Sequence, residues 1–274
     1  MANIPLEDSY TDIIAKTQRG LSIGDEELSK RSGVAPAELA RLKSGELHES
    51  NARKVAAGLN LGADALIELA KKAWFPAPLE TPGLACFNTP YDDMMVNSYL
   101  VFDPKTKEGV AFDTGATCEG MMAYAAEHKI KITLILITHT HIDHIVDLEK
   151  LKKETGAPAY VGEKENFPKA EAFAAGKTFK VGNLKIETRQ TSGHARGGIT
   201  YVISGLDRKL AIVGDAIFAA SMGGGMISFA EALATNRKEI FSLPDETIIC
   251  SGHGPLTTVG EQKKHNAFYP EFQK

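Results

Sequence analysis

Three histidines and an aspartate directly follow an uninterrupted apolar run in the middle of the chain, where residues 135–144 are Ile-Leu-Ile-Thr-His-Thr-His-Ile-Asp-His. The apolar residues 134–137 are rich in β-branched side chains, which is typical of a strand buried on both faces. Alternate residues of an extended chain point to the same side, so His139 and His141 can bind one cation. Asp143 and His144 belong to the turn or helix start that follows. This spacing favours two metal ions at the end of a strand.

Histidines near a strand end can also be ordinary solvated surface residues. Three further motifs argue against that interpretation, because His194 lies in Thr-Ser-Gly-His, Asp215 in Val-Gly-Asp and His253 in Ser-Gly-His-Gly. Each motif follows an apolar or extended stretch and contains glycine, which allows another backbone segment to approach closely. We therefore interpret these residues, together with those of the first motif, as candidates for one metal centre.

The order of the motifs resembles the metallo-β-lactamase fold superfamily, whose signature His-x-His-x-Asp-His, then His, Asp and His, is matched here at every position. The resemblance covers the chain from about residue 96 to the C-terminus. It implies an α/β fold of the αββα sandwich type. It also implies that the residue at every signature position binds metal. The first ion would be bound by His139, His141 and His194, and the second by Asp143, His144 and His253. Asp215 would lie between the two ions. Asp113, in Asp-Thr-Gly, resembles the supporting loop of such sites, and we expect it to orient a ligating histidine.

A pair of cations about 3.5–4 Å apart can hold a bridging water, lower the pKa of that water and polarise a carbonyl group. The expected reaction is therefore hydrolysis of a small-molecule substrate. Asp215 would set the metal spacing, and Asp143 would bind a metal and relay a proton, so these two are the candidate catalytic residues. Nitrogen and oxygen ligands suit zinc, iron and manganese. We expect two divalent ions, zinc first, with iron or manganese as alternatives.

Within the superfamily, residues 251–266 are similar to the end of short bacterial glyoxalase II-like enzymes, which hydrolyse glutathione thioesters. The resemblance implies an ester, thioester or lactone substrate. Those enzymes place a basic residue soon after the bridging aspartate, whereas residues 223–226 are Gly-Gly-Gly-Met here, and Pro255 occupies a position where tyrosine is frequent. Lys263 and Lys264 could still meet a carboxylate. Iron-dependent persulfide dioxygenases, which use only the equivalents of His139, His194 and Asp215, are an alternative.

The first part of the chain, residues 1–75, has helical periodicity and no convincing strand, which predicts a small all-α domain. A glycine turn at Gly33 separates two amphipathic segments, and Gly45 ends the second. This arrangement resembles the helix-turn-helix of the Cro and phage-repressor class. Prolines and a glycine in residues 76–83 predict a linker. The predicted catalytic domain then comprises residues 84–274.

The predicted recognition helix is poorly suited to reading DNA, because residues 35–38 are Ala-Pro-Ala-Glu and offer few hydrogen-bond donors. Residues 1–75 contain 10 Lys+Arg and 11 Asp+Glu, a net charge of −1, although phosphate contact requires a basic face. Arg41, Lys43, Arg53 and Lys54 could form a local basic patch. We expect the helices instead to pack on the metal domain near the glycine loop (residues 223–226), to cover the pocket, or to pair in a homodimer. A ligand-sensing transcription regulator is the alternative.

Overall composition is that of an ordinary globular protein of 274 residues with a net charge of −4, which gives no general attraction to nucleic acid or to an anionic membrane. No apolar run reaches the roughly 18 residues needed to span a bilayer, and no signal peptide pattern opens the chain. We therefore predict a cytoplasmic location. The three cysteines are few and widely spaced, so we expect no disulfide framework and a buried, inert thiol at Cys250.

The remaining pattern alternates strands and helices, as in a layered α/β protein. We predict two strands within residues 97–115, helices at residues 121–129 and 147–155, one alternating stretch at 179–190, strands at 199–204 and 209–214, a flexible loop at 218–225, a helix at 228–243 and a strand before His253. We expect His48, His128 and His265 to be solvated.

Overall fold

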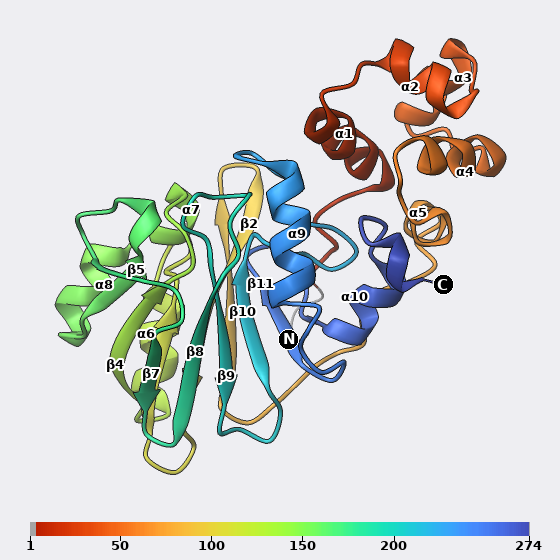
Figure 1. Cartoon of the computed structure of the whole chain (residues 1–274). Coiled ribbons are helices and arrows are strands. Elements are labelled where there is room, and N and C mark those ends of the chain that lie inside the picture. Colours follow the sequence, from red (N-terminus) through yellow and green to blue (C-terminus); the bar gives the residue numbers. More distant parts are fainter. Residues whose placement is uncertain (1–3, 274) are drawn as a thin grey trace.

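The protein is a four-layer sandwich in which two sheets lie face to face and helices cover both outer faces (Figure 1). This computed structural model describes residues 4–273, so the first three residues of the predicted helical domain and the last residue of the predicted catalytic domain lie outside the described part. The layered α/β architecture expected from the sequence is confirmed.

The first sheet has six strands in chain order. Antiparallel pairing joins the first three strands, and parallel pairing joins the rest. Its strands are β1 (Leu84–Tyr91), β2 (Met94–Phe102), β3 (Glu108–Phe112), β4 (Lys131–Ile137), β5 (Ala159–Gly162) and β6 (Glu171–Phe173). β4 carries the apolar run at 134–137, and its side chains on both faces are buried, as predicted.

The second sheet also has six strands, in the order β12-β11-β10-β9-β8-β7. Its strands are β7 (Thr178–Val181), β8 (Leu184–Gln190), β9 (Ile199–Ser204), β10 (Leu210–Gly214), β11 (Ile248–Ser251) and β12 (Thr257–Thr258). β10 and β11 are parallel, whereas the other neighbours are antiparallel. An apolar layer that includes Phe112, Leu136 and Tyr201 fills the space between the two sheets.

Helices complete the sandwich. α6 (Glu119–Glu127) and α8 (Leu148–Thr155) pack on the outer face of the first sheet, where Met121 and Leu151 are fully buried. α9 (Phe229–Glu239) and α10 (Val259–His265) lie on the side of the second sheet (Figure 1). The short helix α7 (Ile142–Ile145) follows β4, and 3₁₀ turns occur at Glu163–Glu165 and Pro270–Phe272.

Several sequence-based boundaries were wrong. The alternating stretch at 179–190 is a hairpin of two strands, since Gly182 at φ 54° turns the chain between β7 and β8. The predicted helix at 228–243 ends as α9 at Glu239, because the chain then turns to bury Ile240 and Phe241 in the core. Strands β1, β5 and β6 were not predicted.

The loop at residues 218–225, which we predicted to be flexible, is largely buried in the structure. Phe218 and Ser221 exchange backbone hydrogen bonds of 3.0 and 3.1 Å across a tight turn that contains Ala220 at φ 64°. Residues 218–222 are all buried. The glycines of this loop serve close packing, because a Cβ atom at Gly223 or Gly225 would overlap neighbouring backbone atoms.

The described part of residues 1–75 contains helices and no strand, as predicted. The helices are α1 (Tyr10–Leu21), α2 (Asp25–Ser32), α3 (Pro36–Lys43), α4 (Glu49–Gly58) and α5 (Ala63–Ala70). Ser9 and Asp12 form a capping box at the start of α1. Gly33 ends α2 in the left-handed conformation at φ 67°, which separates α2 from α3. Residues 76–83, the predicted linker, form no helix or strand.

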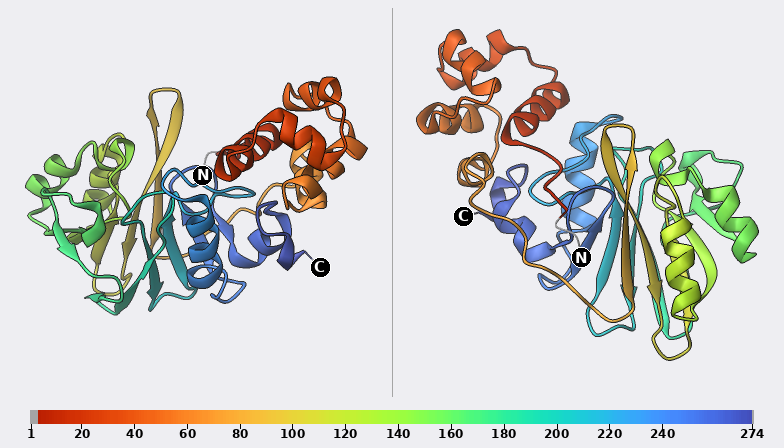
Figure 2. Two further views of the ribbon diagram at one scale, coloured as in Figure 1. Left: turned by 45° about the horizontal axis from the view of Figure 1, so that its top comes forward. Right: turned by 180° about the vertical axis from the view of Figure 1, so that it is seen from behind.

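The N-terminal helices share one apolar core with α9, α10 and the second sheet, although their ribbons form a separate lobe in the views of Figure 2. The ring of Phe229 in α9 lies against Gly20 of α1, where a Cβ atom would be 2.2 Å from the ring. His265 stacks on Trp74 with ring centroids 4.4 Å apart, and its Nδ1 forms a hydrogen bond of 2.8 Å with Oε2 of Glu68. The expectation that His265 is solvated was therefore wrong, whereas His48 and His128 are exposed.

Cysteines Cys86, Cys118 and Cys250 are all unpaired thiols, as predicted. Cys250 is fully buried in β11, and burial raises its pKa well above the ordinary value, so it is the inert thiol that we expected. Among residues 4–273, no helix has the length and apolar character needed to cross a membrane.

Candidate metal centre

The candidate ligands lie where several strands end at one edge of the sandwich. β3 and β4 are parallel, and so are β10 and β11, so the residues that follow each pair lie side by side. Asp113 follows β3 and His139 follows β4 on the first sheet, while Asp215 follows β10 and His253 follows β11 on the second. His194 comes from the loop after β8. The two sheets therefore bring these residues together from both sides.

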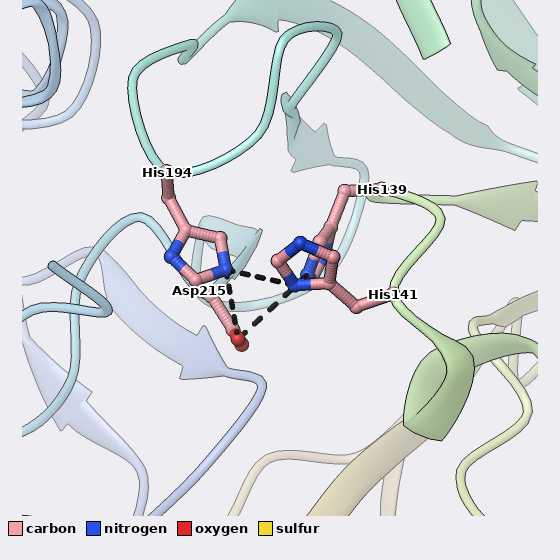
Figure 3. Close-up of side chains that lie close together, drawn as sticks. All are labelled: His139, His141, His194 and Asp215. Atoms are coloured by element: carbon pink, nitrogen blue, oxygen red, sulfur yellow. Dashed lines mark hydrogen bonds and ion pairs between the residues drawn. The ribbon is translucent and has the colours of Figure 1, made fainter. Parts of the chain in front are cut away.

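One group of donor atoms consists of three imidazoles and a carboxylate (Figure 3). Nδ1 of His141 lies 3.1 Å from Nε2 of His139 and 3.0 Å from Nε2 of His194. Oδ2 of Asp215 lies 3.3 Å from Nε2 of His194. Histidine nitrogens and a carboxylate oxygen arranged around one point are a donor set that fits a divalent transition metal.

The second group consists of Asp143, His144 and His253. Oδ2 of Asp143 lies 3.4 Å from Nε2 of His144 and 3.3 Å from Nε2 of His253. The carboxylate of Asp215 also faces this group, with Oδ1 3.3 Å from Nε2 of His144 and Oδ2 3.5 Å from Nε2 of His253. Asp215 is thus the one residue whose carboxylate contacts both groups.

The outward-facing nitrogens of three histidines are held by hydrogen bonds, which fixes the orientation of these rings. Nδ1 of His144 lies 2.9 Å from Asp113, as expected for the supporting aspartate. Nδ1 of His194 donates to the carbonyl of Gly223 at 2.7 Å, and Nδ1 of His253 donates to the carbonyl of Met95 at 2.7 Å. In each case the other ring nitrogen, Nε2, faces the centre and can bind a cation once it is deprotonated.

His139 is oriented by a hydroxyl group. Thr138 donates its hydroxyl proton to Asp113 at 2.8 Å, so the oxygen of Thr138 accepts from Nδ1 of His139 at 3.0 Å. Nε2 of His139 then faces the same point as the nitrogens of His141 and His194. Asp113 therefore supports two histidines, one directly and one through Thr138.

Two buried polar atoms indicate that a cation fits this centre. Nε2 of His144 and Oδ1 of Asp215 are buried, and neither has a hydrogen-bond partner in the described part of the chain. Buried polar atoms are rarely left unpaired in folded proteins. The two atoms lie 3.3 Å apart, so a cation beside them would satisfy both and offset the charge of Asp215, which is only 7% exposed.

The imidazole pKa values show how strongly the carboxylates act on this site. Burial opposes protonation of His144, but Asp215 and Asp113 outweigh it and raise the pKa to about 10. Burial likewise opposes protonation of His253, and Asp215 with Asp143 raises that pKa to about 11. For His139, burial and the neighbouring imidazoles lower the pKa. Binding of a metal ion to His144 and His253 would therefore release the protons that these two imidazoles hold.

Sequence reasoning missed part of the centre. The carbonyl oxygens of Met95 and Gly223 orient two of the histidines, yet a backbone carbonyl leaves no signal in the sequence. Thr138, immediately before His139, could have been suspected from its hydroxyl group. Lys263, which the sequence left as one possible contact for a substrate carboxylate, pairs with Asp245 at 2.6 Å.

The sequence of this region matches a known family model, the "Metallo-beta-lactamase superfamily", over residues 91–253, which is more than half of the chain. The chain belongs to the metallo-β-lactamase superfamily. The match includes all of the candidate ligands and most of both sheets.

Relatives within the superfamily carry a range of names. A β-lactamase hydrolase-like protein of Xylella fastidiosa (strain 9a5c) is 31% identical over 69% of this chain, but the chain spans only 52% of that protein's length. The probable metallo-hydrolase YqgX of Bacillus subtilis (strain 168) is 27% identical over 67% of this chain and 96% of its own. Hydroxyacylglutathione hydrolase GloC of Haemophilus influenzae is 25% identical over 63% and 92%.

Solved structures share the fold over about two thirds of this chain. The BLEG-1 B3 metallo-β-lactamase is 25% identical, with a TM-score of 0.59 over 68% of this chain and 99% of its own. ETHE1 from Myxococcus xanthus is 22% identical, with a TM-score of 0.60 over 69% and 84%. TTHA1623 in a di-iron-bound form is 23% identical, with a TM-score of 0.53 over 66% and 99%. The last two likenesses show the fold alone.

Membership in the superfamily supports a metal-dependent hydrolase, and the superfamily fold implies a dinuclear site with histidine and aspartate ligands. The two donor groups of this chain have that composition. Neither the comparisons nor the donor types identify the metal.

Proposed function

We propose that this protein is a dinuclear metal-dependent hydrolase of a carbonyl ester, thioester or lactone, similar to glyoxalase II. The observation that carries the proposal is the position of Asp215, whose carboxylate lies within 3.7 Å of ring nitrogens from both donor groups. A single mononuclear site would not require a buried carboxylate between two separate sets of ligands.

Each residue then has a defined task. His139, His141 and His194 would hold one ion, Asp143, His144 and His253 the other, and Asp215 both. Two such ions polarise a carbonyl group and lower the pKa of a bound water. Asp143 is the more accessible of the two carboxylates, since its side chain is 12% exposed against 7% for Asp215. Asp143 is therefore the residue placed to accept a proton near the ions and to pass it to the solvent side.

Three apolar residues close in sequence to candidate ligands or to their hydrogen-bond partners are exposed, which supports a substrate with an apolar acyl group. Ile142, between two candidate ligands, is 66% exposed, and Met226, at the end of the glycine loop, is 73% exposed. Met95, whose carbonyl orients His253, is 37% exposed. Exposed apolar side chains gathered at a polar centre commonly mark a ligand-binding site. The likeness to a hydroxyacylglutathione hydrolase supports an acyl thioester in particular.

The experiment is a metal analysis of the purified protein together with hydrolysis of a panel of small thioesters, esters and lactones. We expect about two equivalents of zinc, with iron or manganese as alternatives, and turnover of at least one substrate. Asp215→Ala should lose at least one metal equivalent and nearly all activity, whereas Asp207→Ala, at an exposed position in the turn between β9 and β10, should retain both.

Two results would contradict the proposal. Unchanged metal content and unchanged rates in Asp215→Ala would exclude Asp215 as the bridging ligand. A single iron per chain, with oxygen consumption in the presence of a persulfide and no hydrolysis of the panel, would favour the dioxygenase alternative.

A further inference from the structure

A short segment of the loop after β10, residues 221–223, holds two of the candidate ligands. The carbonyl of Gly223 accepts from Nδ1 of His194 at 2.7 Å, and its N–H donates to the carbonyl of Asp215 at 3.1 Å. A Cβ atom at Gly223 would lie 2.2 Å from the Asp215 carbonyl oxygen and 2.8 Å from Nδ1 of His194. The loop is therefore packed against both ligands without space between them.

The two residues before Gly223 are held by the N-terminal part of the chain. Lys16 of α1 donates to the carbonyl of Met222 at 2.8 Å. Asp8 accepts from the hydroxyl of Ser221 and from the ammonium group of Lys16. The ion pair is largely shielded, since the side chains of Lys16 and Asp8 are 15% and 9% exposed. One ion pair thus holds two consecutive residues before Gly223, Ser221 through its hydroxyl group and Met222 through its carbonyl.

The same lysine also reaches the other donor group. Its ammonium group lies 5.2 Å from the centre of the Phe218 ring, and that ring meets the imidazole of His253 edge to face at 5.4 Å. Lys16 therefore contacts Met222, which precedes the residue that bonds His194, and Phe218, which packs on His253.

The segment before α1 runs from the N-terminal helices to the side of the second sheet that carries α10 (Figure 2). There the backbone of Glu7 passes over Gly254, the residue after His253, where a Cβ atom would be 3.4 Å from the Glu7 nitrogen. The N-terminal segment therefore lies next to the turn that follows His253.

From these contacts we propose that Asp8 and Lys16 are positioning residues of the metal centre. By holding residues 221 and 222, they keep the carbonyl of Gly223 on Nδ1 of His194 and its N–H on Asp215. This inference rests on the proposed metal site, and it gives the N-terminal segment a role in orienting the metal ligands. Removing either partner leaves the other charge buried without its counterion, so the loop is expected to shift.

The test uses the full-length protein and measures the affinity of each site for Zn²⁺ by competition with a chelator. Residues that orient a ligand typically change metal affinity by about 10–100-fold. We expect Lys16→Met and Asp8→Asn to weaken the site that contains His194 by about tenfold or more. With Co²⁺ as the probe, the visible spectrum of that site should change as well.

Glu68→Gln is the matched control, because it breaks a different ion pair, with His265, across the same packing interface but away from the loop. It should lower thermal stability and leave the affinity within about twofold. Lys16→Arg keeps the cation and should retain most of the affinity.

The inference fails if Asp8→Asn and Lys16→Met bind Zn²⁺ within twofold of the wild type. Should Lys16→Met not fold, Asp8→Asn alone decides, because it keeps the size of the side chain. A wild-type protein that binds no metal would contradict the proposed function instead, so the two failures can be told apart.

Discussion

The carboxylate of Asp113 lies 2.9 Å from Nδ1 of His144, and its other oxygen accepts the backbone N–H of Thr138 at 2.7 Å. Asp113 follows β3, Thr138 follows β4, and His144 lies in α7. One side chain therefore joins the ends of two parallel strands to the helix that carries a candidate ligand. Its backbone, at φ 55°, is in the left-handed region that non-glycine residues rarely adopt.

The first prediction concerns this residue. Asp113→Ala should weaken metal binding by about 10–100-fold, because His144 loses its partner and Thr138 loses the acceptor that orients it toward His139. Chelator competition measures this affinity. Asp207→Ala is the control. Equal affinities in the two variants would show that the histidine orientation does not depend on Asp113.

The second prediction concerns the substrate. We expect little advantage for a glutathione thioester over a plain thioester with the same acyl group. Residues 223–226 carry no charge, and Lys263 is paired with Asp245. One charged hydrogen bond is worth about 1.5–3 kcal/mol. The comparison of kcat/KM for the two substrates is the measurement. A preference of several hundredfold would contradict the prediction, and the exposed Arg196, two residues after His194, would be the first anchor to replace.

The third prediction is a pH dependence at the opposite end of the sandwich. Asp103, after β2, accepts hydrogen bonds from the backbone N–H groups of Asn183 and Lys105, and these bonds lower its pKa to about 2. A lowered carboxyl pKa stabilises the fold above the unfolded value near 4, and this stabilisation disappears as the pH falls toward 2.

Asp103→Asn should therefore lower the free energy of unfolding by about 2 kcal/mol at pH 7. The difference from wild type should shrink as the pH is lowered from about 4 to 2. Denaturant unfolding over this pH range measures it. Asp93→Asn, exposed in the turn between β1 and β2, should show no such trend. A difference that stays constant with pH would assign the effect to packing.

The fourth prediction is that the N-terminal helices do not read a specific DNA sequence. The basic residues that could have formed a patch are largely neutralised, because Arg41 pairs with Glu38 at 3.3 Å, Lys43 with Asp25, and Arg53 with Asp64 at 2.7 Å. Selection from random duplex DNA at physiological salt should enrich no motif. Enrichment of one motif, abolished by replacing Arg41 and Lys43, would instead support a transcription regulator.

The position of the N-terminal helices predicts the effect of their removal. The sequence left open a second copy of the chain, the metal domain or the pocket as the surface they cover. The apolar faces of α1 and α5 pack on α9 and α10, and Lys16 contacts the loop beside the candidate ligands. Deletion of residues 1–74 should therefore disturb metal binding in addition to stability.

The sequence by itself determined the candidate ligand set and the layered fold. The ligands were recognisable because their motifs match the superfamily signature, and alternation along an extended chain predicts that His139 and His141 point to the same side. Turn glycines such as Gly33 were equally visible, since only a few residue types tolerate the left-handed conformation.

Tertiary structure alone decided which groups support those ligands. The bond from Lys16 to Met222 joins residues 206 positions apart, and the bonds from His194 to Gly223 and from His253 to Met95 end on backbone carbonyls. A carbonyl is present at every residue, so its role cannot be inferred from residue type. Contacts between distant segments depend on how sheets and helices pack as whole bodies, and periodicity along the chain reports only which face of each element is buried.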